Sequence, residues 1–393
     1  MKRLSILHRI LARGPALLAC TLLVACASAP RPAPVRSLLR DADYPAPFAV
    51  DPPQRIFALS DAMRRYADTE LRARMRQGDP RRALIRALYD RGQLRLSYDG
   101  GRTRNAAEAY AARAGNCLSL VIMSAAFARH LGLPVSYRRV EVDDQYSRSG
   151  GLLVAAGHVN LVLDRLPSRP MFDADLQQDL TVDFLPAEDL RGERSTALPE
   201  STVVAMYYNN RAAEALAAGH RARSYRWARA AVLQRPDYAP AINTLAVVYL
   251  RDGRLGAAEA ALRAALDLDP ANAGALSNLV QTLQREGRVD AARAYARRLA
   301  AVQPLQPYAS FEAGRQAMAQ GDFARARDLF ERELRLQPDQ SEVHYWLAQA
   351  LWRLGDRRDA VRHLALAADN STTPGSRDLY TAKLEHLKAL HLQ

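Results

Sequence analysis

The sequence predicts an α+β domain followed by an all-α solenoid of helical repeats. Between residues 117 and 164, a run of apolar residues at helical spacing is followed by two runs with the alternation typical of β-strands. From about residue 200 onward, glycine recurs every 34 residues and proline keeps the same period. The chain has 393 residues, which is enough for both parts at about 100–200 residues per domain.

The first 25 residues have the pattern of a bacterial export signal. A basic stretch is followed by an apolar stretch too short to span a bilayer. It ends in Leu23-Val24-Ala25-Cys26, which resembles the bacterial lipoprotein signal box. The resemblance implies cleavage before a lipidated Cys26, and Ala27 after it implies an outer-membrane lipoprotein facing the periplasm. An ordinary secretory signal or a simple anchor is the alternative.

Residues 26–53 are rich in Ala, Pro, Ser and Arg, which predicts a tether to the membrane. Residues 54–198 are expected to form the α+β domain. Its first part carries apolar residues at helical spacing, with helices expected over residues 56–75, 80–90 and 106–113. These helices are expected to surround the core of the domain.

Cys117 stands where a loop becomes a helix. Apolar residues recur at helical spacing after it until Gly132 and Pro134 end the helix. At the first turn of a helix, unpaired N–H groups and the positive end of the dipole favour the thiolate over the thiol. This position suits a nucleophile. Asn116 before it is either an oxyanion-hole donor or an ordinary turn residue.

The expected strands supply partners for this cysteine. Residues 135–142 and 152–164 are predicted strands joined by a polar loop, and the second places His158 and Asn160 on one face. A third short strand over residues 170–174 ends in Asp173, which is expected to orient the imidazole. Asp175 is a second candidate for this role.

At these residues the chain resembles the bacterial transglutaminase-like branch of the papain-like cysteine protease superfamily. The matching stretches are Gly115-Asn116-Cys117, 131–134, Gly157-His158-Val159 and Phe172-Asp173, within about residues 80–185. The resemblance implies a papain-like fold with Cys117 as nucleophile, His158 as general base and then acid, and Asp173 as orienting group. It departs from animal-type transglutaminases, which usually have Trp after the cysteine, where this chain has Leu118. A cysteine or histidine that only packs in the core is the alternative for each residue taken alone.

Residues 199–393 carry the repeat. Glycines 219, 253, 287, 321 and 355 lie 34 residues apart, as do prolines 236, 270, 304 and 338. This pattern resembles the tetratricopeptide repeat, best in residues 239–272, with glycine in the turn between two helices and proline after the second. Residues 376–392 are expected to close the solenoid as an amphipathic helix.

In stacked repeats of this kind the first helix of each pair lines a concave groove. Residues at the corresponding positions mix amides with aromatic side chains, which suits an extended or helical polypeptide partner. Packing between neighbouring helices is the alternative for the aromatic ones. The predicted partner-binding residues are Asn243, Gln281, Phe311, Tyr345, Gln349 and Trp352.

Two classes of function fit these features. The first is a lipid-anchored envelope enzyme, a cysteine hydrolase or acyl transferase acting on peptide or protein amides, whose repeats recruit the substrate. The second is a non-catalytic envelope scaffold in which the repeats mediate assembly. No cofactor, metal or nucleic-acid motif is present in the sequence. The net charge of +13 comes mostly from Arg interspersed with Asp and Glu, which is typical of a solvated surface.

Overall fold

The structure is a computed structural model of the full chain. It describes residues 35–44, 48–76, 78–89, 94, 96–149, 152–166, 178–184, 194–302, 309–371 and 374–391. The signal peptide, Cys26, Asp173 and Asp175 therefore lie outside the described residues. Within the described part, no helix combines the length and apolar character needed to cross a membrane.

A four-stranded antiparallel sheet forms the centre of the amino-terminal part. Its strand order is β5-β4-β3-β6, and a separate pair of two-residue strands, β1 and β2, is parallel. The strands are β1 (Ser97–Tyr98), β2 (Ala114–Gly115), β3 (Val135–Ser149), β4 (Leu152–Leu163), β5 (Leu180–Val182) and β6 (Arg194–Leu198).

The β3–β4 hairpin is longer than the sequence predicts. The polar stretch after residue 142 was expected to be a loop, but β3 continues to Ser149 and pairs with β4 over residues 135–140 and again over 145–149. The pairing shifts register between Val140 and Gln145, which marks a bulge. Strand pairing here satisfies the backbone of residues whose side-chain pattern does not suggest a strand.

Helix α6 (Cys117–His130) packs against β4 and is buried from Leu118 to Ala128. It is hydrophobic on all sides, as expected of a helix inside a core. The helices before it are shorter than predicted, because the region expected as one helix over residues 56–75 is broken into several. They are α1 (Pro53–Ile56), α2 (Asp61–Tyr66), the π-helical turn η3 (Ala67–Leu71), α3 (Arg72–Met75), α4 (Pro80–Tyr89) and α5 (Ala106–Ala112).

The repeat region consists of antiparallel helix pairs. The five glycines of the 34-residue period all have positive φ, between 71° and 86°, and sit in the turn within each pair, as predicted. The helices are α7 (Glu200–Ala217), α8 (Arg221–Gln234), α9 (Ala239–Arg251), α10 (Leu255–Leu268), α11 (Ala273–Arg285), α12 (Val289–Val302), α13 (Ala309–Gln320), α14 (Phe323–Leu336), α15 (Ser341–Leu354), α16 (Arg357–Asp369) and α17 (Pro374–His391).

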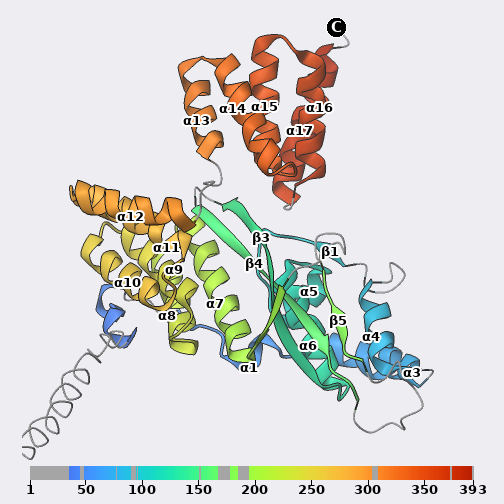
Figure 1. The fold of residues 1–393 in the computed structure, drawn as a ribbon. Coiled ribbons are helices and arrows are strands. Elements are labelled where there is room, and N and C mark those ends of the chain that lie inside the picture. Colours follow the sequence, from blue (N-terminus) through green and yellow to red (C-terminus); the bar gives the residue numbers. More distant parts are fainter. Residues whose placement is uncertain are drawn as a thin grey trace, which may run out of the picture.

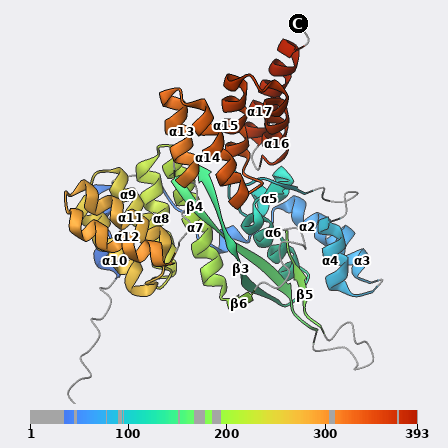
Figure 2. The same ribbon diagram turned by 45° about the horizontal axis from the view of Figure 1, so that its top comes forward.

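One hydrophobic core runs from the amino-terminal helices through α6, the sheet and α7 into α12. Figures 1 and 2 show α7 between the sheet and α8–α12. Val203, Val204 and Tyr207 of α7 are all buried in this core. The boundary expected between residues 198 and 199 therefore does not separate two cores, because α7 belongs to both the repeats and the α+β part.

Helices α13–α17 have their own hydrophobic clusters, apart from the core of α7–α12. Figure 1 shows them as a separate group. Neighbouring helices pack closely within each group, whereas α12 and α13 do not appear among the closely packed pairs. The described helices thus form two stacks, here called stack A (α7–α12) and stack B (α13–α17), where the sequence predicts one continuous solenoid.

Part of the predicted tether is folded against stack A. It contains two 3-10 turns, η1 (Val35–Leu38) and η2 (Asp41–Asp43), followed by the buried Tyr44. The Tyr44 ring stacks on Tyr225 of α8 with centroids 4.2 Å apart, and its hydroxyl donates to Asp252 at 2.5 Å. Residues 35–44, here called the docking segment, are therefore not the free coil that their composition predicts.

Candidate functional site

Cys117 is the first residue of α6, as the sequence predicts. The side chain of Asn116 caps the helix, with Oδ1 accepting from the backbone N–H of Ser119 at 2.9 Å. Gly115 is required by a close approach, because a Cβ there would lie 2.7 Å from Cβ of Ser119. The Asn116 cap and the close packing of Gly115 on Ser119 thus both fix the backbone that enters the helix. Cys117 itself is partly exposed.

His158 lies on β4 with its side chain only 3% exposed. Its Nε2–H donates to Oδ1 of Asp183 at 2.7 Å, and Asn160 donates to Oδ2 of the same carboxylate at 3.2 Å. The expectation that His158 and Asn160 share one face of the strand is confirmed by this common partner. Asp183 directly follows β5, which pairs with Leu161–Leu163 of β4.

The backbone of Asp183 is held by Tyr89 at the end of α4. The Asp183 N–H donates to the Tyr89 hydroxyl at 3.0 Å, and that hydroxyl donates to the Asp183 carbonyl oxygen. The Tyr89 ring also stacks on Phe184, with centroids 5.7 Å apart. The carboxylate that orients His158 is therefore itself positioned by a residue from another element.

The thiol of Cys117 faces the imidazole of His158. Among the described residues, Nδ1 of His158 is buried without a well-aligned hydrogen-bond partner, and Cys117 lies close enough to interact with the ring. Burial opposes the charged imidazolium, but the interactions with Asp183 and Cys117 outweigh it and raise the pKa of His158 to about 9. These interactions favour the protonated imidazole.

The structure brings together Cys117 and His158, two of the three residues that the sequence predicts. Asp173 and its rival Asp175 lie outside the described residues, and the carboxylate in contact with His158 is Asp183. Asp183 was not among the residues predicted from the sequence. The sequence signal for Asp183 was the short Leu-Thr-Val run over Leu180–Val182, which forms β5 and ends directly before Asp183.

Asn116 is a capping residue and not an oxyanion-hole donor. Its Nδ2 donates to Oγ1 of Thr103 at 2.9 Å, so both ends of the amide are occupied within the protein. Thr103 is in turn tied to α7, because its N–H donates to Glu214 and its carbonyl oxygen accepts from Arg211 at 2.9 Å. Stack A thus supports the loop beside the Cys117 helix.

The predicted partner-binding residues do not line one groove, because they are divided between the two stacks. In stack A, Gln281 is exposed and Asn243 accepts a hydrogen bond from Asn278 at 2.9 Å. In stack B, Gln349 is half-buried, and the half-buried Trp352 packs against the core beneath Arg357.

Two of the aromatic residues in stack B have structural roles. Phe311 is fully buried against Phe330, so its prediction as a groove residue is wrong. Ser310 stands where two other repeats have Ile242 and Leu276, and the neighbouring Phe311 fills the core instead. Tyr345 stacks on Tyr380 of α17 with centroids 4.9 Å apart, and therefore holds the closing helix.

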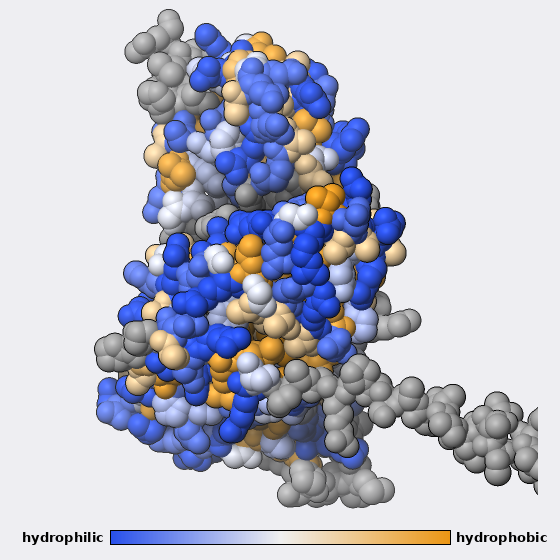
Figure 3. All heavy atoms as spheres, turned by 90° about the vertical axis from the view of Figure 1, so that its left-hand side faces the viewer, coloured by the Kyte–Doolittle hydropathy of each residue, from blue (hydrophilic) through white to orange (hydrophobic). Residues whose placement is uncertain are grey.

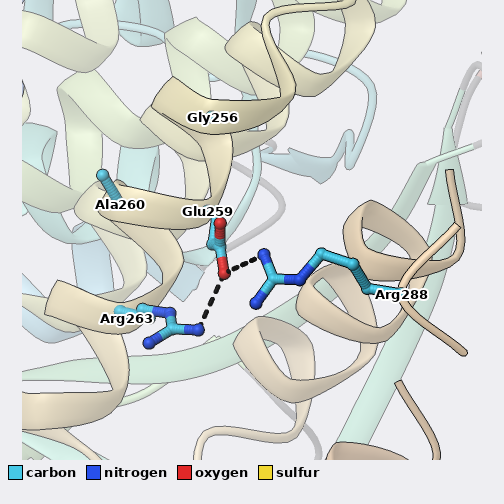
Figure 4. Close-up of a pocket in the computed structure, with 5 residues that line it drawn as sticks. All are labelled: Gly256, Glu259, Ala260, Arg263 and Arg288. Atoms are coloured by element: carbon cyan, nitrogen blue, oxygen red, sulfur yellow. Dashed lines mark hydrogen bonds and ion pairs between the residues drawn. The ribbon is translucent and has the colours of Figure 1, made fainter. Parts of the chain in front are cut away.

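A shallow hollow on α10 carries charged residues (Figure 4). Glu259 lies between Arg263 and Arg288, and each guanidinium donates to its Oε1 at 2.8 Å. Arg288 also donates to Oε2 of Glu286 at 2.9 Å, so four charged side chains form a network at the surface. The structure gives this hollow a role in joining α10 to the start of α12.

Comparison with known proteins identifies the repeats. A family model described as tetratricopeptide repeat matches residues 249–313 and 317–374, which fall within α9–α17. These segments are therefore tetratricopeptide repeats, as the sequence pattern indicates. Repeats of this class bind peptide or protein partners, so the match supports a protein-interaction or scaffold role.

Solved structures that match part of the chain include three proteins at low identity. PilF of Pseudomonas aeruginosa is 23% identical; the match covers 49% of this chain and 87% of the PilF chain, with a TM-score of 0.30. MamA is 18% identical; the match covers 44% of this chain and 93% of the MamA chain, with a TM-score of 0.25. YrrB, described as a TPR protein with an unusual peptide-binding site, is 19% identical, covering 46% and 92%, with a TM-score of 0.25.

The comparisons give no support to the transglutaminase-like resemblance. No curated protein matches the chain. The family match begins at residue 249, beyond Cys117, His158 and Asp183. The chemistry of these three residues therefore has to be argued from their geometry alone.

Proposed function

We propose that this protein binds a polypeptide partner through its repeats and carries a cysteine-based acyl-transfer site in its amino-terminal part. The partner-binding function is supported by the tetratricopeptide-repeat match. In stack A, helix α11, the first helix of its pair, presents small and amide side chains to solvent, including Ser277 and Gln281. Such side chains pair with the backbone of an extended segment without demanding a charged sequence.

Selection from a random peptide library displayed on phage tests this function. Peptides enriched on the full chain are expected to lose affinity at least about tenfold when Ser277→Arg and Gln281→Arg are combined, because two bulky cations then occupy the surface. Asp290→Arg on α12 is the matched control, since its side chain is 97% exposed and lies on a second helix of a pair. Equal loss in both variants would contradict the assignment of this surface.

The acyl-transfer function rests on the contact between His158, Asp183 and the thiol of Cys117. A protonated imidazole beside the sulfur stabilises the thiolate, which attacks a carbonyl carbon. The C–S bond forms while the carbonyl π electrons move to oxygen. When the intermediate collapses, the C–N or C–O bond to the leaving group breaks, and His158 gives that group its proton.

The second half of the reaction uses the same residues. His158, now neutral, takes a proton from water or an amine, which attacks the thioester carbonyl and releases Cys117 as thiolate. Hydrolysis and transfer differ only in this second nucleophile. We propose Asp183, in place of Asp173, as the group that holds the imidazole with Nδ1 toward the sulfur.

Alkylation of Cys117 by iodoacetamide at pH 7 tests the activated thiol. We expect His158→Ala to slow alkylation at least about tenfold, because the imidazolium no longer stabilises the thiolate. His130→Ala is the control: this histidine bonds Asp68 at 2.9 Å at the other end of α6. Equal rates in wild type and His158→Ala would support the non-catalytic scaffold instead.

The lipoprotein box supports anchoring through Cys26 as a further part of the proposal. Cys26→Ser is expected to abolish lipidation when the full chain is expressed in a Gram-negative host. Mass spectrometry of the membrane fraction would then show loss of the acylated mature form. An unchanged mass and membrane fraction would contradict both the anchor and the proposed outer-membrane location facing the periplasm.

A further inference from the structure

A carbonyl attacked by Cys117 needs hydrogen-bond donors for the oxygen that becomes negative. The proposed chemistry so far supplies a nucleophile, a proton carrier and an orienting carboxylate, but no side chain for this oxygen. Donors for such an oxyanion lie roughly 2.7–3.1 Å from it and commonly contribute a hundredfold or more to the rate. Candidate donors are therefore the N–H and O–H groups near Sγ of Cys117.

The amides nearest to the site each donate a hydrogen bond to another residue of the protein. Asn116 donates to Thr103 at 2.9 Å, and Asn160 donates to Asp183 at 3.2 Å. The cap of α6 uses the N–H of Ser119, while the N–H of Cys117 itself belongs to the first turn and has no acceptor within the helix. This backbone N–H supplies one donor at the sulfur.

The hydroxyl of Tyr98 is a second donor near the same sulfur atom. Its Oη lies 4.0 Å from Sγ of Cys117. The oxyanion is bonded to the carbon that is bonded to Sγ, so it lies two bonds from the sulfur. A hydroxyl at this distance from Sγ can therefore reach hydrogen-bond distance from that oxygen without movement of the backbone.

The position of Tyr98 is fixed by the same segment that leads into α6. Tyr98 pairs with Gly115 in the parallel β1–β2 bridge, and the N–H of Asp99 donates to the Gly115 carbonyl oxygen at 3.0 Å. Asp99 also binds Arg104 at 2.8 Å, which closes the following turn. The hydroxyl and the nucleophile are thus carried by two neighbouring, hydrogen-bonded segments, and such rigid placement is what an oxyanion hole requires.

We infer that Tyr98 is a catalytic residue whose hydroxyl donates to the oxyanion formed when Cys117 attacks a carbonyl group. This inference rests on the proposed acyl-transfer function and adds a residue that the transglutaminase-like resemblance did not identify. Tyr98 is 46% exposed as a whole residue, but desolvation of its hydroxyl and the neighbouring Cys117 both raise its pKa, so the phenol keeps its proton at neutral pH. A neutral hydroxyl is the form that can donate.

Two reagents separate this role from simple support of the thiolate. Iodoacetamide reacts with Cys117 at a saturated carbon and forms no oxyanion, whereas p-nitrophenyl acetate acylates it through a tetrahedral oxyanion. In Tyr98→Phe, acylation of the full chain should slow about 10- to 100-fold while alkylation stays within about twofold. Phenylalanine keeps the ring, so the fold is preserved. Tyr295→Phe on α12 is the control.

The outcomes distinguish failure of the inference from failure of the proposed function. If wild-type Cys117 is alkylated and acylated in a manner that depends on His158, but Tyr98→Phe leaves acylation unchanged or slows both reactions equally, the role of Tyr98 is overturned. If wild-type Cys117 shows no His158-dependent reaction with either reagent, the acyl-transfer function fails and the inference fails with it. Mass spectrometry of the acetylated peptide locates the modified residue.

Discussion

The amino-terminal part and the repeats use their polar residues differently. Around Cys117 and His158, side chains from α4, α6, β1, β4 and the end of β5 converge on a few atoms, and most of these groups are tied to each other. In stack A, by contrast, polar side chains such as Ser277 and Gln281 lie exposed along one helix. Convergence favours chemistry at a point, while the repeated helix favours contact along a surface.

The two stacks differ in how they are supported. Stack A shares its core with the sheet, is covered on α8–α10 by the docking segment and contacts the loop before Asn116 through α7. Stack B relies on clusters of its own and on Tyr380 of the closing helix. The face containing α8–α12 is mostly hydrophilic with a band of apolar residues (Figure 3). A change in stack B should therefore leave the candidate site intact, whereas a change in stack A should not.

The largest expected effect comes from the carboxylate at the candidate site. Asp183→Asn should reduce the acylation rate of Cys117 by between about 10² and 10⁴, because a neutral amide does not stabilise the imidazolium, and its NH2 group can donate to Nε2 and so select the wrong tautomer. The pKa of His158 should fall below about 9, since burial then opposes the imidazolium with less compensation. Stopped-flow acylation and an NMR titration of His158 measure the two effects.

Asp173→Asn tests the acid that the sequence predicts against Asp183. If Asp183 orients His158, the Asp173 variant should keep most of the rate and the high pKa of His158. The reverse order would restore the prediction made from the sequence and overturn the assignment of Asp183. Asp179→Asn controls for a change near β5, because this carboxylate accepts from the N–H of Arg165 at 3.1 Å and not from His158.

The sequence predicted those features that depend on local pattern. The glycine period placed the helical turns, the apolar run placed Cys117 at the start of α6, and strand alternation placed His158 and Asn160 together. The third site residue depended on which later segment pairs with β4, and that is decided by packing across the sheet. A candidate acid chosen from the order of residues alone could not identify Asp183.

The features of the repeats that the sequence did not predict also depend on contacts between distant segments. Periodicity assigns each residue a position, but it does not show that Phe311 replaces Ser310 in the core or that Tyr345 is covered by α17. It also does not reveal that the docking segment binds stack A, because its composition is that of a coil. Contacts between distant segments, and not local preference, decided each of these cases.

The next largest effect is expected where the docking segment meets stack A. Tyr44→Ala should destabilise the amino-terminal part by roughly 3–5 kcal/mol, since it removes a buried ring stacked on Tyr225. Tyr44→Phe should cost only about 1 kcal/mol, from the lost hydrogen bond to Asp252. Chemical denaturation, with hydrogen exchange of α8–α10, measures both. A free energy of unfolding unchanged by the alanine variant would show that the segment does not stabilise stack A.

A smaller effect is expected in stack B from one methyl group. In Gly314→Ala the added Cβ would lie 2.5–3.0 Å from three ring carbons of Phe330, so the variant should lose about 1–3 kcal/mol. Gly256→Ala in α10 has no atom within 4 Å and should gain roughly 0.5–1 kcal/mol from helix propensity. Hydrogen exchange should localise the first change to α13–α16. Loss of protection in α6 as well would show that the stacks are coupled.

The smallest expected effect is a difference in pH response between the two regions. His344 and His363 of stack B are stacked, with their Nδ1 atoms 2.9 Å apart, and His344 Nε2–H donates to the carbonyl oxygen of Pro338. Burial, the neighbouring His344 and Arg362 lower the pKa of His363 to about 4, although Asp359 opposes this shift. Burial also lowers the pKa of His344, against the Pro338 hydrogen bond and the charge of Asp339.

Because the folded-state pKa of His363 lies below the ordinary 6.5, stack B should lose stability as the pH falls below 6.5 toward 4. His158 has the opposite sign, so its contribution is present below 6.5 and is lost as the pH rises through about 9. Between pH 7 and pH 5, stack B should lose about 1 kcal/mol once solvent screening is allowed for, or roughly 4–8 °C in Tm. In a Trp227→Phe background the remaining tryptophans, Trp346 and Trp352, report on α15 alone. His363→Gln should remove most of the acid sensitivity of that fluorescence transition, while the unfolding transition of α6 and the sheet stays unchanged. An equal acid shift with and without the His363 substitution would show that another group takes up the proton.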